Sequence, residues 1–102
     1  MRITYPTAIV LFAVSRGVRY GFDIMDATGL QSGTVYPILR RLEDAGMLRS
    51  RWEPVADARD EQRPPRRYYQ VTGAGLRASK DAAERFPGLT ATLGVAGSPA
   101  RA

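Results

Sequence analysis

The strongest periodic pattern in the chain lies in residues 32–46, which read SGTVYPILRRLEDAG. Apolar side chains recur there at the three- and four-residue spacing that places them on one face of an α-helix. Ser32 or Thr34 is a suitable N-cap for this helix, and Gly46 is suited to end it. About 12–14 helical residues would form a rod of roughly 20 Å. The apolar face consists of Val35, Ile38, Leu39, Leu42 and Ala45.

Two shorter helices are predicted before this segment. The first spans residues 6–16 and begins with Pro6, which a helix tolerates in its first turn. It is apolar on nearly every side, which predicts either a central position in the domain or contact with a partner chain. The second spans residues 21–28 and carries Asp23 in its first turn, at the positive end of the helix dipole. Only residues 30–33 separate it from the third helix.

A β-hairpin is predicted after the third helix. Residues 47–52 and 66–71 alternate between two sets of side chains, as the two strands of a hairpin do. The connecting residues 53–65 are rich in charge and proline, and they exceed the about two to five residues usual for a hairpin loop. A loop of this length is more often functional or mobile than structural. A fourth helix is predicted from Thr72 to about Phe86.

The predicted order of elements is α-α-α-β-β-α, an α+β fold that is mostly α. Three short helices, of which two are joined by a tight turn, followed by a two-stranded hairpin, are typical of a winged helix-turn-helix. We expect residues 1–86 to form this domain together with its C-terminal helix. Residues 87–102 are mostly small and are expected to form a flexible tail.

The composition excludes most catalytic and metal sites. The 102 residues contain no His and no Cys, which excludes disulfides, Cys/His zinc sites, and catalysis by a Cys nucleophile or a His base. Asp57, Asp60 and Glu61 lie in the Pro-rich loop without a glycine turn that would fix an ion, so we interpret them as solvated. We therefore expect no enzyme activity, no metal and no cofactor.

The longest apolar run, residues 8–14, is far shorter than the about 20 residues that a membrane span needs. No small-residue cleavage site of a signal peptide follows this run. Both observations favour a cytoplasmic protein without a membrane partner.

The chain is basic, with 15 Arg and Lys against 10 Asp and Glu, and a formal net charge of +5. Every cation except Lys80 is Arg, a residue suited to paired hydrogen bonds with phosphate or guanine. Arg-rich compositions also accompany GC-rich codon usage, so this excess alone leaves nucleic-acid binding open.

Two groups of residues are candidates for contact with DNA. In the third helix, small and hydroxyl side chains of the first turn can approach base edges or phosphates, and an arginine lies one turn later on the same face. These recognition-helix candidates are Ser32, Gly33, Thr34, Tyr36 and Arg40. An alternative interpretation is an ordinary amphipathic helix whose polar face meets only water.

The second group is a basic cluster at the return of the hairpin, where a wing can follow the DNA backbone. It consists of Arg63, Arg66 and Arg67, and the acidic residues of the same loop offer alternative partners to these arginines. We expect Trp52 and Tyr69 to pack at the base of the hairpin, with a ligand-stacking role for Trp52 as the alternative.

Taken together, these segments resemble PadR-family transcriptional regulators. The stretch SGTVYPILRRLE at 32–43, with AGML at 45–48, resembles the recognition helix of that family and the strand after it. The stretch RRYYQVT at 66–72, followed by Gly75, resembles its second wing strand and the entry to the fourth helix. Residues 20–24, YGFDI, are similar to its His-Gly-Tyr-Glu-Ile signature, with Tyr in place of His and Phe in place of Tyr.

The resemblance implies a homodimeric repressor that binds double-stranded DNA at an operator with inverted-repeat half-sites. It also implies that the third helix enters the major groove while the wing touches the backbone. The recognition-helix candidates match the DNA-contacting start of that helix, and Arg66 and Arg67 match the wing.

Members of the family usually dimerise through C-terminal helices that pack on the partner's first helix. This chain offers only the predicted fourth helix and a short tail for that contact, and we expect Phe12, Leu76 and Phe86 to lie in it. Effector sensing is known in the family, but no residue here identifies a small-molecule effector.

An alternative function of another class is a winged-helix protein-interaction module. It would use the acidic loop or the apolar first helix to dock a partner protein.

Overall fold

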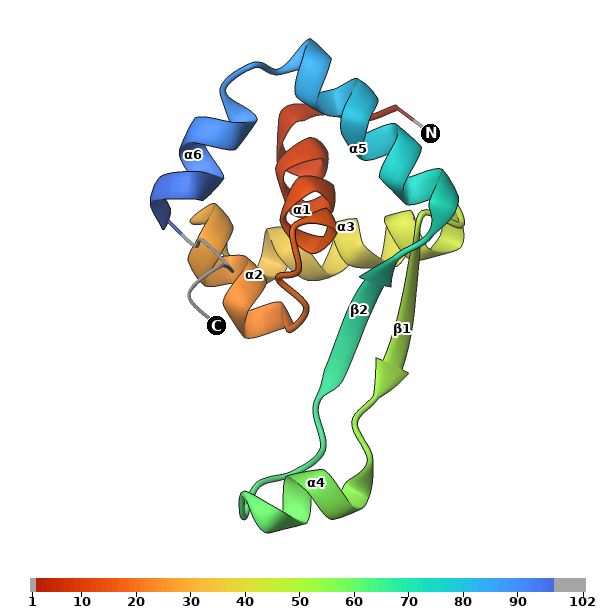
Figure 1. Cartoon of the computed structure of the whole chain (residues 1–102), viewed down its shortest axis with the longest axis vertical. Helices are drawn as coiled ribbons and strands as arrows, with labels where there is room; N and C mark the ends of the chain where they lie inside the picture. The colour runs from red at the N-terminus through yellow and green to blue at the C-terminus, as the bar shows by residue number, and fades with distance from the viewer. Residues whose placement is uncertain (1, 97–102) are drawn as a thin grey trace.

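The structure is a computed structural model that describes residues 2–96 (Figure 1). It is mostly helical with one two-stranded antiparallel sheet, which confirms the predicted winged helix-turn-helix. Among the described residues, no helix has the length and apolar character needed to cross a membrane. In chain order the elements are α1 (Tyr5–Ser15), α2 (Gly21–Thr28), α3 (Ser32–Asp44), β1 (Leu48–Trp52), α4 (Val55–Asp60), β2 (Arg67–Val71), α5 (Gly73–Arg85) and α6 (Leu89–Ala96).

Helix α1 lies at the centre of the domain and is surrounded by other elements of the same chain (Figure 1). It packs against α2, α3, β2, α5 and α6, and residues 7–14 are all buried. Burial on every side explains why this helix is apolar all round. Of the two alternatives that its sequence left open, the central position is the one observed.

Helices α2 and α3 form the helix-turn-helix. Gly29 ends α2 in the left-handed conformation, with φ of +75°, which glycine adopts without steric cost. The apolar face of α3 is buried as predicted through Val35, Ile38, Leu39 and Leu42, whereas Ala45 lies beyond the helix end and is exposed. The N-cap prediction is wrong, because Gln31 takes the extended cap position and the helix already starts at Ser32.

Strands β1 and β2 pair in the register Leu48↔Val71 to Trp52↔Arg67, close to the predicted strand bounds. The segment that follows α1 pairs with β2 on the side away from β1, where the N–H of Tyr69 donates to the carbonyl of Arg19 at 2.9 Å. Tyr20 and Tyr68 form an isolated antiparallel bridge beside this bond. The wing is therefore attached to the body along the inner edge of β2.

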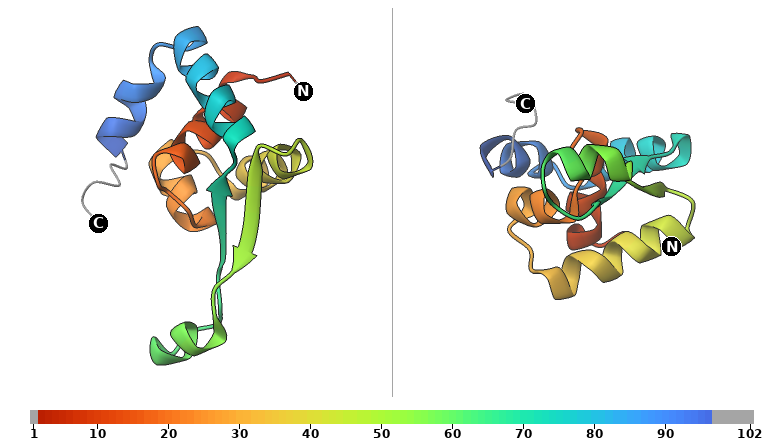
Figure 2. Two further views of the ribbon diagram at one scale, coloured as in Figure 1. Left: turned by 45° about the vertical axis from the view of Figure 1, so that its right-hand side comes forward. Right: turned by 90° about the horizontal axis from the view of Figure 1, so that it is seen from below.

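The sequence predicted a loop between the two strands of the hairpin, but this connection is partly helical. It contains the six-residue helix α4, which lies at the far end of the molecule's longest dimension (Figures 1 and 2). Asp57 occupies the first turn of α4, where its carboxylate interacts favourably with the positive end of the helix dipole. Ala58 of the same helix is fully buried. Gln62 closes the segment with φ of +57°.

The expected flexible tail from residue 87 onward is wrong for residues 89–96, which form α6. Leu89 and Leu93 are four residues apart, so they share one helical face, and both are buried in the core. Helix α6 packs against α1 and α2, and this packing explains why residues 89–96 are helical and not a flexible tail. Residues 97–102 of the expected tail lie outside the described part of the chain.

Candidate nucleic-acid interface

One face of α3 is open to solvent and carries all five residues that the sequence predicted for DNA recognition. These residues are Ser32, Gly33, Thr34, Tyr36 and Arg40. Neither hydroxyl at the helix start is used as a cap, so both stay available for contacts. The surface above Gly33 is open, because a side chain placed there would meet nothing within 4 Å. Arg40 forms no ion pair with any residue that the structure describes, which leaves its charge uncompensated.

Tyr36 also fixes how α3 sits against α2. Its phenol ring lies over Gly21, the first residue of α2, so closely that a Cβ atom at position 21 would collide with the hydroxyl. Part of the Tyr36 side chain remains exposed. The same residue thus positions the helix pair and leaves part of its side chain at the surface.

The base of the wing is organised by Glu53, whose side chain is only 9 % exposed. Its carboxylate accepts two hydrogen bonds from the Arg63 guanidinium, one from the backbone N–H of Arg66 at 2.8 Å, and one from the Tyr20 hydroxyl at 3.2 Å. These donors, with Arg63 foremost, lower the pKa of Glu53 from its usual 4.5 to about 2. One carboxylate therefore ties together both ends of the wing insertion and the start of α2.

Arg63 was predicted to contact DNA, but its guanidinium is already occupied. Besides the two bonds to Glu53, its Nε donates to Glu61 at 3.0 Å, and its side chain is largely covered. These carboxylates raise the pKa of Arg63 further above its ordinary value. Arg63 shapes the wing, because most of its donors are used within the chain, and its contact with DNA stays a prediction.

Arg66 and Arg67 are placed differently, with side chains 47 % and 46 % exposed. The Arg66 guanidinium stacks over the Tyr20 ring, 4.0 Å from its centroid, and lies 3.5 Å from Glu53. Arg67 donates to the Ser50 hydroxyl at 2.6 Å and lies 3.5 Å from Glu43 of α3. Each guanidinium is held in position on one side and open on the other.

A cleft of about 400 Å³ lies between the start of α2, the exposed face of α3 and the wing. The two half-exposed arginines face it together with exposed aromatic side chains. Its lining residues are Tyr20, Gly21, Phe22, Tyr36, Trp52, Arg66, Arg67 and Tyr69. The cleft therefore brings Tyr36 of the first candidate group next to Arg66 and Arg67 of the second.

Within this cleft, Tyr69 is buried as predicted, and burial raises the pKa of its hydroxyl. The prediction that Trp52 packs at the hairpin base is wrong, because its side chain is 65 % exposed. It shares a strand face with Leu48, which is buried, but it lies at the end of β1 where the hairpin has passed beyond the body. The exposure of Trp52 and of Phe22, which is 75 % exposed, has no local signal in the sequence that predicts it.

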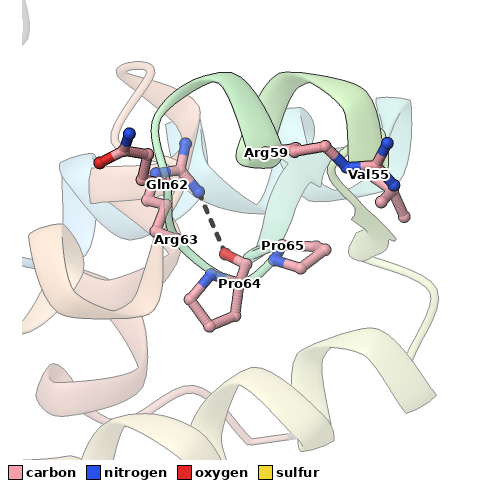
Figure 3. Close-up of a pocket in the computed structure, with 6 residues that line it drawn as sticks. All are labelled: Val55, Arg59, Gln62, Arg63, Pro64 and Pro65. Atoms are coloured by element: carbon pink, nitrogen blue, oxygen red, sulfur yellow. Dashed lines mark hydrogen bonds between the residues drawn. The ribbon is translucent and has the colours of Figure 1, made fainter.

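A second cavity, of about 520 Å³, lies at the wing tip (Figure 3). It is lined by Val55, Arg59, Gln62, Arg63, Pro64 and Pro65, and Arg63 also donates to the Pro64 carbonyl at 3.3 Å. No carboxylate is among the described residues that line it.

The three residues expected at a dimer contact differ in accessibility. Phe12 is only 7 % exposed and belongs to the core of its own chain, so it offers almost no surface to a partner. Phe86 is half-buried against the ring of Tyr5. Leu76 on α5 is exposed and remains available.

Comparison with solved structures finds the same fold in several bacterial proteins. The protein smu.1704 from Streptococcus mutans UA159 is 27% identical, with 80% of this chain and 76% of that chain covered and a TM-score of 0.68. A PadR family transcriptional regulator from Eggerthella lenta DSM 2243 is 26% identical, with 86% and 78% covered and a TM-score of 0.61. A PadR family transcription regulator from Clostridium difficile R20291 is 21% identical, with 86% and 96% covered and a TM-score of 0.63.

No curated protein matches the chain significantly. The sequence model described as "Transcriptional regulator PadR-like family" matches residues 10–81, which include the helix-turn-helix, the whole wing and most of α5. Because this match covers well over half of the chain, the chain belongs to the PadR-like family of transcriptional regulators.

Proposed function

We propose that this DNA-binding transcriptional regulator is a homodimeric repressor that occupies an operator with inverted-repeat half-sites. The observation that carries the proposal is the exposed face of α3, which bears small, hydroxyl and cationic side chains and whose Tyr36 also lines the basic cleft beside the wing. With 13 residues, α3 is long enough to lie in a major groove. Two such helices in one dimer would enter successive grooves about 34–36 Å apart and block promoter access.

The proposal divides the DNA contacts between two surfaces. Tyr36 and Arg40 would approach base edges from the major groove, with the helix start carrying Ser32, Gly33 and Thr34 closest to the backbone. Arg66 and Arg67 would hold phosphates from the wing, because each has an open side and an orientation fixed by the chain.

The dimer contact is proposed on the outer face of α5 at Leu76, with Phe86 at its border. This choice follows from exposure, because α6 of the same chain already covers α1 and leaves Phe12 inside the core. A homodimer is what an inverted-repeat operator requires, since a two-fold DNA site mirrors a two-fold protein.

A band-shift titration with the DNA upstream of the protein's own gene tests the proposal. Arg40→Ala should weaken binding by about 1–3 kcal/mol if it reads a base. Arg2→Ala is the charge-matched control, because Arg2 is exposed, precedes α1 and lies outside both the cleft and α5, so its loss should change affinity little. Absence of any shift at low salt, where electrostatic binding is strongest, would refute DNA binding as the function.

The alternative of a protein-interaction module has lost one of its two supports. The apolar helix α1 is covered by the same chain and has no free face. The acidic wing insertion remains, with four carboxylates against two guanidinium groups in residues 53–65. Binding of a partner protein that survives deletion of the α3 contacts would favour this second function.

A further inference from the structure

Phe22 and Trp52 are the two most exposed of the large apolar side chains in the described part of the chain, at 75 % and 65 %. Phe22 lies in the first turn of α2 and Trp52 at the end of β1, yet both line the same cleft. Single exposed apolar residues are common, but two aromatic side chains in one basic cleft form a surface suited to a ligand.

The polar groups of the cleft define the chemistry of that ligand. Arg66 and Arg67 supply two guanidinium groups, and Tyr36 contributes a phenol that is partly exposed. Glu53 forms an ion pair with Arg66 and Glu43 forms one with Arg67. These ion pairs orient the exposed sides of both guanidinium groups before any ligand binds. Paired guanidinium donors suit a phosphodiester, and flanking aromatic faces suit an apolar ring next to it.

We infer that this cleft holds one strand of the DNA backbone, with a phosphate between Arg66 and Arg67 and the adjoining deoxyribose rings against Phe22 and Trp52. The inference rests on the proposed function and extends it to two apolar residues that carry no charge. Trp52 is well placed for this, because it lies opposite Arg67 in the strand register and 6.0 Å from that guanidinium. An apolar contact beside each phosphate would add affinity without adding charge.

The first experiment uses the wild-type protein, because Trp52 is its only tryptophan. An operator duplex is titrated while its binding is followed by the anisotropy of a dye on the DNA, and quenching of Trp52 emission by acrylamide is measured in parallel. We expect bound DNA to protect Trp52 from acrylamide with the same midpoint as the anisotropy. If the anisotropy saturates while quenching is unchanged, the cleft inference is wrong and the proposed function stands. If the duplex does not bind at low salt, both fail.

The second experiment separates apolar from ionic contacts through salt dependence. Phe22→Ala and Trp52→Ala should weaken operator binding roughly three- to tenfold at every salt concentration and leave the slope of log K against log salt unchanged. Arg66→Ala should instead lower that slope by about 0.9, because one phosphate contact is lost. Val55→Ala is the matched control, since Val55 is exposed on the wing tip outside the cleft. Unchanged affinity in both aromatic variants, with folding verified by circular dichroism, would overturn the inference.

Discussion

The carboxylate of Glu53 accepts two hydrogen bonds from the guanidinium of Arg63, ten residues later in the sequence. This ion pair joins the two ends of the segment that connects β1 to β2. Glu53 follows β1 directly, and Arg63 lies four residues before β2. The same carboxylate reaches the N–H of Arg66 and the hydroxyl of Tyr20. This contact closes the insertion that carries α4 and fixes the direction in which the wing leaves the body.

Removing this carboxylate should loosen the wing without unfolding the body. In Glu53→Ala, the N–H of Arg66 loses its acceptor, so its hydrogen exchange should become faster than in the wild type. Glu61→Ala is the control, because Glu61 is exposed and, among the residues that the structure describes, its carboxylate bonds only to the Nε of Arg63. Equal exchange rates at Arg66 in the wild type and Glu53→Ala would show that the carboxylate does not hold the wing.

The stability that Glu53 contributes should depend on pH in one direction. The pKa of Glu53 is about 2 in the folded protein against 4.5 when unperturbed, so folding favours its ionised form. The contribution is fully present above pH 4.5 and is lost as pH falls from there through about 2. The difference in melting temperature between wild type and Glu53→Gln should therefore be constant from neutral pH to about 5 and shrink below it. A constant difference down to pH 2 would contradict the lowered pKa.

Gly21→Ala should destabilise the helix-turn-helix. The added methyl group collides with the phenol of Tyr36, and such overpacking costs about 1–3 kcal/mol of the free energy of unfolding. Gly33→Ala provides the control, since nothing lies within 4 Å of that position. Urea unfolding of Gly21→Ala, Tyr36→Ala and the double variant completes a cycle. We expect the loss at position 21 to be smaller when Tyr36 is already Ala, and strict additivity would refute the proposed contact.

Helix α6 should contribute to the stability of the domain rather than behave as a tail. Leu89 is fully buried, and Leu89→Ala should lower the free energy of unfolding by about 2–5 kcal/mol. The neighbouring Thr90 is exposed, and Thr90→Ala should change stability little. Equal midpoints of denaturation for the two variants would restore the flexible-tail interpretation.

The local patterns of the sequence determined α1, α2, α3, α5, the two strands and the exposed face of α3, but they did not predict α4 or α6. Helical periodicity and strand alternation are properties of neighbouring residues, so the buried side of α3 and the pairing of β1 with β2 could be predicted. The apolar character of α1 indicated burial on all sides, but could not show whether the chain itself or a partner provides the cover.

Tertiary structure decided which charges and aromatic rings are free. Arg63, Arg66 and Arg67 form one basic cluster in the sequence, but only the fold brings the Glu53 carboxylate onto Arg63 and leaves the other two side chains half-exposed. Trp52 alternates in step with buried Leu48 and is nevertheless exposed, because its strand extends past the body. Pairing and exposure depend on how distant segments are placed in space, and a short sequence window holds no information on that placement.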